Sequence, residues 1–475
     1  MTPADRRASP RFIALIVACA LFMAQLDSSV VLVALPQMAD SFGVRPVDLS
    51  IGVTIYILAQ ALVLPASSWV ADRFGAKRVF VLALVGFTLA SVLCALSRTL
   101  PEFVAARILQ GAAAALMVPI SRILLLQATA KEDLIGVMTV STVPMLFAPT
   151  LGPPVGGFIV TYLSWPWIFI LNVPVGIVGV ALVMRFIPAP AAVARRPFDV
   201  TGFALLAVAT SGVLFGLEQL SLSNPHWVLA AGLIAGGGVV GIVAWRHLKR
   251  TAHPAVSLHS VGVPTFYATT LGPGTLVRLP AAALAFVLPL LFQVVLGFSA
   301  LYSGLLLLGV NGGDLLLKAV TTRTLRRFGF RRVLIVSAGL MCASIAACAL
   351  AAARTPYWVS FAVLTASGMA RSLLFSGMST LAFADVPREE LTSGTVLWNI
   401  VLQLMNALGV SLAALIVNLI AMLAHEPAGH VSALSCEAAL LGIVALGAVS
   451  TVAFVRLKPE AGVSVSGHGR RRGAG

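Results

Sequence analysis

Long apolar runs separated by short polar segments make up almost the whole chain. An α-helix needs about 20 apolar residues to cross the hydrocarbon core of a bilayer, so the pattern predicts an all-α polytopic membrane protein with about 14 transmembrane helices. The run at 266–296 contains Gly272, Pro273 and Gly274, which are typical of a broken or tilted helix. The approximate limits of the expected spans are 12–35, 49–70, 79–97, 102–124, 135–161, 167–187, 200–219, 227–246, 266–296, 300–320, 331–353, 357–383, 392–423 and 433–455.

The composition excludes several classes of protein. Hydrophobic residues make up 59% of the chain and the mean hydropathy is +0.99. Charged residues make up 10%, against roughly 25% in soluble domains. These values exclude a soluble globular protein, a disordered chain and a secreted disulfide-rich scaffold. The five cysteines show no CxxC pair and no metal-ligand spacing, so we expect small buried thiols and no metal site.

The basic residues, which give the chain a formal net charge of +15, are unevenly distributed. If the N-terminus lies in the cytoplasm and the spans alternate, the outer loops hold only Arg45, Arg98 and Arg354. The other loop cations fall in or beside the inner segments, as the positive-inside rule requires. An even number of spans, with both termini in the cytoplasm, follows. This topology accounts for the basic excess, so we expect no nucleic-acid partner.

A short loop occurs twice. The segment RFGAKRV (73–79) follows the second expected span, and RFGFRRV (327–333) follows the tenth. Matching loops of equal orientation predict a parallel duplication, with two pseudo-symmetric six-helix bundles related by an axis along the membrane normal and two inserted helices between them. The alternative is that any short inner loop is rich in Arg and Lys. The expected divisions are an N-terminal bundle at 1–187, a linker with the inserted helices at 188–264, a C-terminal bundle at 265–456 and a disordered basic tail at 457–475.

Four motifs resemble those of a known transporter family. LDSSVVLVALP (26–36) resembles the first-helix motif L-D-x-T-x-V-N-V-A-L-P, and ADRFGAKR (71–78) resembles the loop G-x-L-A-D-R-x-G-R-K. RILQGAAAA (107–115) resembles the fourth-helix motif R-x-x-Q-G-x-G-A-A, and APTLGPPVGG (148–157) resembles the fifth-helix antiporter motif G-x-x-x-G-P-x-x-G-G. The chain thus resembles the major facilitator superfamily, and within it the fourteen-helix drug:proton antiporter branch (EmrB/QacA-like). Its C-terminal half is most similar to MdtD-type members.

The resemblance implies a secondary active efflux transporter that works by proton antiport and alternating access. Drugs or other small amphiphilic compounds are the implied substrates, and the proton gradient serves in place of a cofactor. The implied setting is the bilayer of a bacterial inner (plasma) membrane, where the protein would be a monomer. The sequence has no G-x-x-x-x-G-K-[ST] loop, no H-E-x-x-H and no G-x-S-x-G, so we expect neither direct use of ATP nor enzymatic activity.

Asp27 and Arg107 are the candidates for proton coupling. Asp27 lies roughly 22 Å into the first span at 1.5 Å per residue, so its carboxylate must face the bundle or a wet cavity, where desolvation favours protonation. Arg107 keeps its charge in a protein and cannot carry the proton, and Gln110 shares its helix face. The resemblance implies that Arg107 takes part in a proton relay. The alternatives are a structural hydrogen-bond acceptor for Asp27 and a structural ion pair for Arg107.

Three further cations lie inside spans of the C-terminal half. Arg278 and Arg371 are expected near mid-membrane, whereas Lys318 is closer to the inner edge, where it can snorkel or pair with Asp314. A positively charged cavity would favour an exporter of organic anions such as carboxylates. Alternatively, these arginines pair with backbone carbonyls or face the inner rim. The expected substrate-binding residues are Arg107, Gln110, Arg278 and Arg371.

Two of the motifs are candidates for conformational control. The resemblance implies that the loop at 71–78 is a latch between the halves, with a solvated basic loop as the alternative. In the motif at 148–157, proline bends the helix and small residues four apart permit close helix approach. The resemblance implies a seal between the halves there. The candidate residues are Asp72, Arg73, Gly75, Lys77, Arg78, Gly152, Pro153, Gly156 and Gly157.

Overall fold

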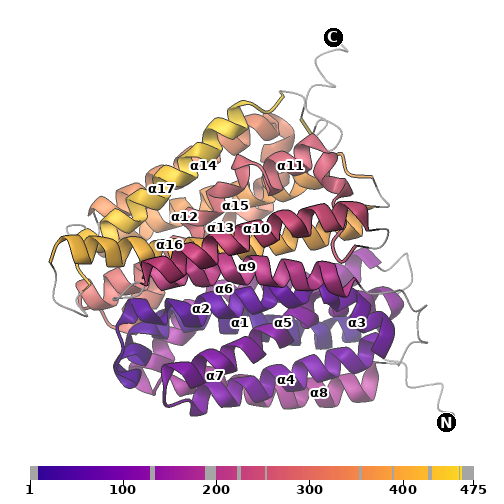
Figure 1. The fold of residues 1–475 in the computed structure, drawn as a ribbon. Coiled ribbons are helices and arrows are strands. Elements are labelled where there is room, and N and C mark those ends of the chain that lie inside the picture. Colours follow the sequence, from indigo (N-terminus) through magenta and orange to yellow (C-terminus); the bar gives the residue numbers. More distant parts are fainter. Residues whose placement is uncertain are drawn as a thin grey trace.

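The long helices run side by side from one end of the molecule to the other (Figure 1). The computed structural model describes residues 9–128, 134–187, 199–221, 226–251, 254–351, 356–387, 390–425, 431–458 and 461–462. Every regular element within these residues is a helix, which confirms the expected all-α fold.

The first half of the chain forms the indigo and purple bundle of Figure 1. Its 3-10 turns, at Pro46–Leu49 and Leu64–Ala66, flank α2. Its helices are α1 (Pro10–Phe42), α2 (Ser50–Val63), α3 (Ser67–Phe74), α4 (Ala76–Leu96), α5 (Leu100–Ala128), α6 (Leu134–Tyr162), α7 (Pro166–Ile170) and α8 (Asn172–Phe186).

Two helices, α9 (Val200–Ser221) and α10 (Trp227–Arg250), pack against each other and follow the first bundle in the chain. The second bundle then begins after a 3-10 turn at His259–Gly262. Its elements are α11 (Pro264–Thr270), a 3-10 turn (Pro273–Val277), α12 (Arg278–Leu290), a π-helical turn (Leu291–Val295), α13 (Ala300–Phe328), α14 (Phe330–Ala351), α15 (Tyr357–Phe383), α16 (Leu391–Leu423) and α17 (Ala433–Val455).

The expected spans match the helices closely. Among the described residues, 13 helical segments are long and apolar enough to cross a membrane. The remaining expected span, 135–161, is α6, whose 29 residues give a length of about 43 Å at 1.5 Å per residue.

The ninth span is broken, as its Gly-Pro-Gly sequence predicts. α11 ends at Thr270, and Gly272 adopts an extended conformation with ψ 178° before Pro273. A residue before proline favours this conformation because the proline ring clashes with a helical predecessor. The chain therefore restarts as a 3-10 turn before α12.

Helix contacts repeat between the two bundles. In the first bundle, α1 packs against α6 and α8, α5 against α2 and α4, and α4 against α8. In the second, α12 packs against α16 and α17, α15 against α13 and α14, and α14 against α17, which is the same set of pairs. Between the bundles, α6 meets α13 and α2 meets α16. This correspondence confirms two pseudo-symmetric bundles with α9 and α10 as an insertion.

The repeated loops also have matching backbones. Gly75 lies between α3 and α4 with φ +88°, and Gly329 lies between α13 and α14 with φ +77°. Glycine reaches positive φ without the steric penalty that other residues meet there. The glycine that the two repeated loops share thus provides a positive φ in both halves.

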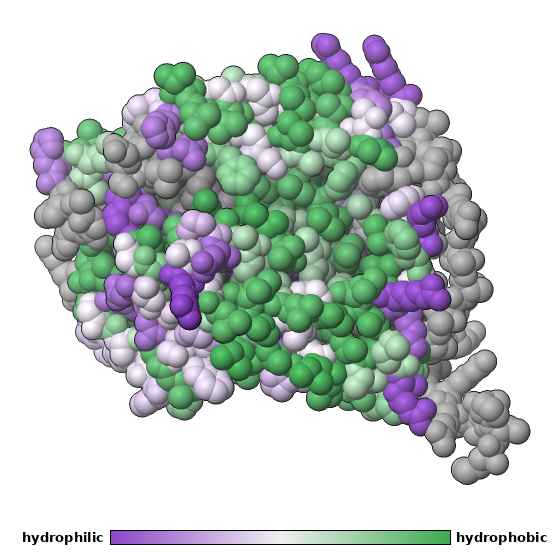
Figure 2. All heavy atoms as spheres, turned by 60° about the horizontal axis from the view of Figure 1, so that its bottom comes forward, coloured by the Kyte–Doolittle hydropathy of each residue, from purple (hydrophilic) through white to green (hydrophobic). Residues whose placement is uncertain are grey.

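The outside of the helix bundle is apolar. Figure 2 brings the first bundle to the front and shows a broad hydrophobic area in the middle of this face, with hydrophilic residues gathered at its two ends. α4 exposes Leu82 and Leu89, and α8 exposes 62% of Ile177. Exposed apolar surface of this extent marks contact with lipid. The chain is a multi-pass membrane protein.

We call the side that carries the start of α1 and the end of α17 the terminal face, and the opposite side the distal face. On the terminal face, Lys77 Nζ donates to the carbonyl of Met184 at 3.0 Å, which places the start of α4 beside the end of α8. A guanidinium nitrogen of Arg331 donates to the carbonyl of Val455 at 2.7 Å, which places the start of α14 beside the end of α17. The two repeated loops therefore lie on one face.

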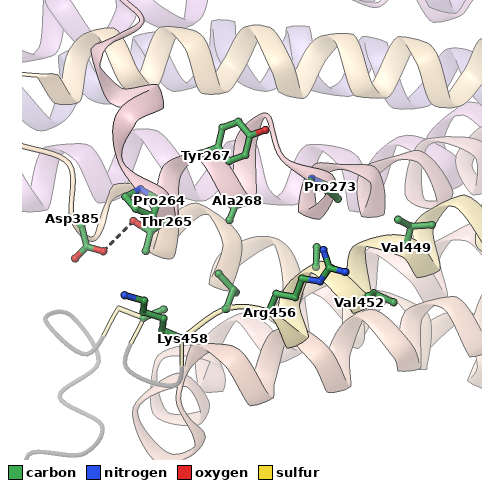
Figure 3. A pocket seen from close by; sticks show the side chains of 13 residues that line it. Pro264, Thr265, Tyr267, Ala268, Pro273, Asp385, Val449, Val452, Arg456 and Lys458 are labelled. Atoms are coloured by element: carbon green, nitrogen blue, oxygen red, sulfur yellow. Dashed lines mark hydrogen bonds between the residues drawn. The ribbon is translucent and has the colours of Figure 1, made fainter.

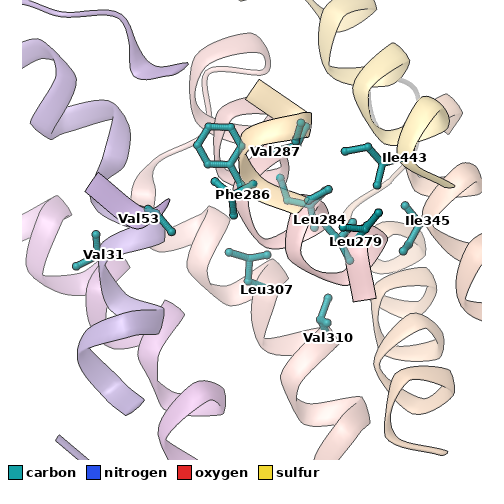
Figure 4. Packing of buried hydrophobic residues seen from close by; sticks show 14 of the residues in the cluster. Val31, Val53, Leu279, Leu284, Phe286, Val287, Leu307, Val310, Ile345 and Ile443 are labelled. Carbon is teal, nitrogen blue, oxygen red and sulfur yellow. The ribbon is translucent and has the colours of Figure 1, made fainter. Parts of the chain in front are cut away.

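The two bundles pack together towards the distal face. The residues of α1 from Leu26 to Ala39 share one hydrophobic cluster with α12 and α13, part of which is shown in Figure 4. By contrast, the buried hydrophobic residues of α1 from Ile13 to Ala24 that belong to a cluster pack with helices of their own bundle. Thr161 Oγ1 also accepts a hydrogen bond from the amide of Leu301 at 3.1 Å. The distal side is thus closed.

Hydrogen bonds to the carboxylate of Asp199 fix the inserted helices at the terminal face. Asp199 accepts hydrogen bonds from the amides of Gly202 at 2.8 Å and Ala255 at 3.1 Å, and its carboxylate lies 2.8 Å from the His247 ring. Burial opposes ionisation of this carboxyl, but the bonds from Gly202, His247 and Ala255 outweigh burial and hold the pKa of Asp199 below its usual range. The ionised carboxylate joins the start of α9, the end of α10 and the following loop.

Candidate functional site

A buried ion pair lies inside the first bundle. A guanidinium nitrogen of Arg107, on α5, donates to Asp27 Oδ2, on α1, at 2.9 Å. Asp27 is 2% exposed and Arg107 is 1% exposed. The sequence prediction that Asp27 faces the bundle agrees with this position, and the pair brings together the two candidates for proton coupling.

Amide side chains complete the shell of the carboxylate. Asp27 Oδ1 accepts from Gln110 Nε2 at 3.0 Å and from Asn172 Nδ2 at 2.8 Å. Both amides also donate to Ser91 Oγ, at 2.9 and 3.2 Å. Helices α1, α4, α5 and α8 therefore meet at one polar network.

The guanidinium of Arg107 is held from three sides. Its Nε donates to the carbonyl of Gly52 at 3.2 Å, another nitrogen donates to Gln110 Oε1, and its carbon lies 4.0 Å from the centre of the Tyr56 ring. A Cβ on Gly111 would overlap the carbonyl of Tyr56, so glycine is what lets α5 approach α2 this closely. The network thus depends on small-residue packing as well as on charge.

The ion pair is part of the contact between α1 and α5. Arginine stays charged in a protein, so protonating Asp27 leaves the Arg107 charge without its counter-ion. Breaking one partner of a buried pair costs about 3–5 kcal/mol unless the other charge finds a new partner. Loss of either charge of the pair would therefore weaken the packing of α1 against α5.

Sequence reasoning missed Asn172 and Ser91 in this network. Asn172 stands in an otherwise apolar segment, and a polar residue at membrane depth is by itself a signal of function. Ser91 gave no comparable signal, because serine often bonds its own helix, as it does here to the Phe87 carbonyl at 2.9 Å.

A cavity of about 190 Å³ lies between the two bundles. Most of its wall is apolar, and its polar members are two serines of α1, one asparagine of α13 and one arginine of α15. The residues that line it are Ser28, Ser29, Leu32, Pro149, Pro153, Ala281, Leu284, Ala285, Leu307, Val310, Asn311 and Arg371. Its position between the halves, with both contributing, is that expected of a transport site.

Of the four expected substrate-binding residues, only Arg371 lines this cavity. Its guanidinium donates to Asn311 Oδ1 at 3.0 Å and to Asp314 Oδ2 at 3.2 Å. Lys318 also lies 4.0 Å from Asp314. The carboxylate of Asp314 thus compensates part of the positive charge that the sequence predicted for this half.

The other three candidates are buried away from the cavity. Arg107 and Gln110 belong to the network with Asp27. Arg278 precedes the cavity residue Ala281 by three positions and so lies one turn away on the same face of α12. It is 3% exposed and stacks on the Trp398 ring at 4.2 Å.

The candidate latch residues lie on the terminal face. Lys77 bonds to the end of α8, Arg73 lies 5.8 Å from the Trp69 ring, and Arg78 is exposed. Gly75 provides the positive φ of the loop. The side chain of Asp72 lies outside the described part of the structure, so its predicted contact stays a prediction.

The glycines of the fifth-helix motif face two different neighbours. A Cβ on Gly152 or Gly156 would overlap α1 of the same bundle, at Ser29 and Val30. A Cβ on Gly157 would overlap α13 of the other bundle at the Ala300 carbonyl. Helix α6 is therefore wedged between α1 and α13.

Pro153 faces a glycine of the other bundle, Gly304, which sequence reasoning missed. A Cβ on Gly304 would overlap the carbonyl of Pro153. Pro153 also lines the central cavity. The contact between α6 and α13 thus adjoins the cavity.

Comparisons with known proteins agree with this geometry. The family model "Major Facilitator Superfamily" matches residues 17–277 and 274–473. The chain is 38% identical over 453 residues to a protein of Serratia proteamaculans named as multidrug resistance protein MdtD, covering 94% of this chain and 93% of the relative. A relative of the same name from Pectobacterium atrosepticum is 35% identical over 457 residues, covering 95% of this chain and 97% of the relative.

A solved structure shares the fold. It is the partially occluded inward open conformation of the xylose transporter XylE from E. coli, with a TM-score of 0.62 and 12% identity. The match covers 95% of this chain and 100% of that one. From its paired bundles, its central cavity and these matches, the chain belongs to the major facilitator superfamily and is a membrane transporter related to MdtD multidrug resistance proteins.

Proposed function

We propose that this protein exports drugs or other small amphiphilic compounds by proton antiport, with the two bundles rocking around the central cavity. The observation that carries the proposal is the network of Asp27 and Arg107, both nearly inaccessible to solvent and bridged at 2.9 Å. Proton uptake by Asp27 removes the counter-ion of Arg107, and the released charge drives the repacking of α1 against α5. Alternating access couples that repacking to the cavity.

In this proposal the terminal face is cytoplasmic, because basic loops remain on the inner side of a membrane. Both ends of the chain then lie on the cytoplasmic side of a bacterial membrane, and the central cavity is closed towards the outside. The protein would act as a monomer, since each chain carries both bundles and a complete cavity. The proton gradient is the energy source, with no cofactor.

The cavity wall supports amphiphilic substrates. Leu32, Leu284 and Leu307 offer apolar contact, while Ser28 and Asn311 offer hydrogen bonds. An apolar wall with a few polar groups matches molecules that themselves combine an apolar body with a few polar groups. The names of the MdtD relatives support the same substrate class.

The test is transport by purified protein in proteoliposomes. With the interior acidified, we expect saturable accumulation of ethidium that stops when nigericin collapses the pH gradient. Liposomes without protein are the control. Accumulation that continues at the same rate with neither a pH gradient nor a voltage would overturn proton antiport.

Export of organic anions such as carboxylates is the second candidate function, and Arg278 favours it. In the described part of the chain no acidic side chain pairs with this buried guanidinium, and its Nε has no hydrogen-bond acceptor. Desolvated charge without a partner is costly, so an anionic substrate that reached it would be bound strongly.

A binding comparison separates the two candidates. If the substrate is an anion, Arg278→Gln should weaken benzoate binding at least about tenfold, the usual size of one lost charge-assisted hydrogen bond, and leave ethidium binding unchanged. Isothermal titration of the purified protein measures both. Arg323→Gln, an exposed cation on α13, is the matched control. If the protein binds ethidium but not benzoate, and Arg278→Gln leaves ethidium binding unchanged, export of organic anions is excluded.

A further inference from the structure

A second, larger pocket lies on the outside of the C-terminal bundle, near the terminal face (Figure 3). Its volume is about 660 Å³. It lies between α11 and the last turns of α17, and the chain just beyond α15 closes one side. None of its lining residues belongs to the central cavity.

The break in the ninth span creates this pocket. Were the helix continuous, side chains of one further turn would fill the space beside α17. Instead α11 ends at Thr270 and the chain restarts at Pro273, leaving Ala268 and Pro273 to line the gap. The pocket is thus a feature of the backbone and not of one side-chain rotamer.

The walls change from apolar to cationic along the depth of the pocket. Val449 and Val452 of α17 line the part nearer the middle of the membrane span, and Arg456 and Lys458 follow just beyond the end of this helix (Figure 3). Because α17 rises 1.5 Å per residue, Arg456, which caps the helix, lies roughly 6–10 Å closer to the terminal face than the valines. An occupant that fits both parts has an apolar body and an anionic head.

The pocket opens towards the bilayer. Val449 is 48% exposed, Val452 is 57% exposed and Tyr267 is 49% exposed, although all three lie in or beside membrane spans. Apolar side chains with this exposure in a membrane protein contact lipid. The molecules that reach the pocket are therefore those of the membrane itself.

The charges at the mouth are complementary to an anion. Neither Arg456 nor Lys458 forms an ion pair with another described residue. The one carboxylate of the lining, Asp385, accepts a hydrogen bond from Thr265 Oγ1 at 3.0 Å (Figure 3). Two cations against one engaged carboxylate leave a positive mouth at the level where phospholipid phosphates lie.

We propose that this pocket binds one anionic phospholipid of the adjoining leaflet, with its phosphate at Arg456 and Lys458 and an acyl chain along Val449 and Val452. Binding needs no covalent step and does not depend on the substrate of the transporter. The site is separate from the central cavity, so lipid retention and transport can be measured apart.

Native mass spectrometry tests the proposal. The purified protein is first freed of lipid and then mixed with equal amounts of phosphatidylglycerol and phosphatidylcholine. We expect phosphatidylglycerol to be retained at least about fivefold more than phosphatidylcholine, since each cation near anionic lipid contributes roughly that factor. The variant Arg456→Gln/Lys458→Gln should reduce the ratio to near one. The matched control is Arg323→Gln/Arg326→Gln, which removes the same charge from exposed positions near the end of α13 and should keep the preference.

Two further measurements test the pocket itself, one with a variant that fills it and one with a soluble competitor. Ala453→Phe fills the space without changing charge and should release phosphatidylglycerol, whereas soluble glycerol 3-phosphate should not compete, since it lacks the acyl chains. Equal retention of the two lipids by the wild type, or a preference that survives Arg456→Gln/Lys458→Gln, would overturn the proposal. Competition by glycerol 3-phosphate would assign the cations to a free phosphate site instead.

Discussion

Replacing Asp27 with asparagine should abolish proton-driven export, with a loss of at least about 100-fold. The amide oxygen of asparagine can still accept the bonds from Gln110 and Asn172, so the polar network keeps a similar shape. The variant nevertheless carries no titratable proton at this position. The residue opposite Arg107 therefore no longer gains and loses its charge with proton binding. An energy of about 3–5 kcal/mol for the broken pair corresponds to a factor of 100 or more. Ethidium accumulation in acid-loaded proteoliposomes measures the effect.

A substitution on the same helix provides the control. Asp40 lies on α1 at an exposed position, and Asp40→Asn should export at the wild-type rate. Ethidium counterflow without a pH gradient distinguishes loss of proton coupling from loss of folding, because the exchange of ethidium for ethidium needs no net proton movement. We expect Asp27→Asn to retain counterflow. Gradient-driven export by this variant at the wild-type rate would remove Asp27 from the coupling mechanism.

Adding a single methyl group at Gly304 should open the contact between the two bundles. In Gly304→Ala the Cβ overlaps the Pro153 carbonyl, so α6 and α13 must separate. Overpacking of this kind costs roughly 1–3 kcal/mol, which lowers the population of the distally closed conformation about 5- to 150-fold. Disulfide cross-linking of Thr161→Cys with Leu301→Cys, whose parent residues share a hydrogen bond, reports this closure. We expect the cross-linking yield and the export rate to fall together.

The same helix supplies the matched control for this experiment. A Cβ on Gly312 of α13 meets nothing within 4 Å, so Gly312→Ala changes helix propensity without adding an interbundle contact. It should cross-link and export like the wild type. Gly157→Ala, which overlaps the Ala300 carbonyl, should reproduce the defect from the opposite side of the interface. Normal cross-linking in both Gly304→Ala and Gly157→Ala would show that this contact does not hold the distal side closed.

The sequence predicted the charged residues of the candidate site but not most of their partners. Asp27 and Arg107 were found because charge is rare in apolar spans and each such residue stands out. The sequence predicts substrate contact for Gln110, and the structure places its amide against the carboxylate of Asp27. Asn172 lies 145 residues from Asp27, and no spacing within one helix relates the two. The sequence predicts Arg371 as part of a positively charged cavity, and only the fold brings Asp314 to it across 57 residues.

The order and limits of the helices, the broken ninth span and the duplication were determined by the sequence itself. In a bilayer every span must satisfy its own backbone hydrogen bonds, so apolar length and Gly-Pro interruptions decide local structure without help from distant residues. Which polar group meets which, that α6 is wedged between α1 and α13, and that an external pocket remains beside α17 were decided only by tertiary structure. These depend on how side chains of separate helices fit together. Small residues four apart mark a packing surface on one helix, but they do not specify which helix will meet it.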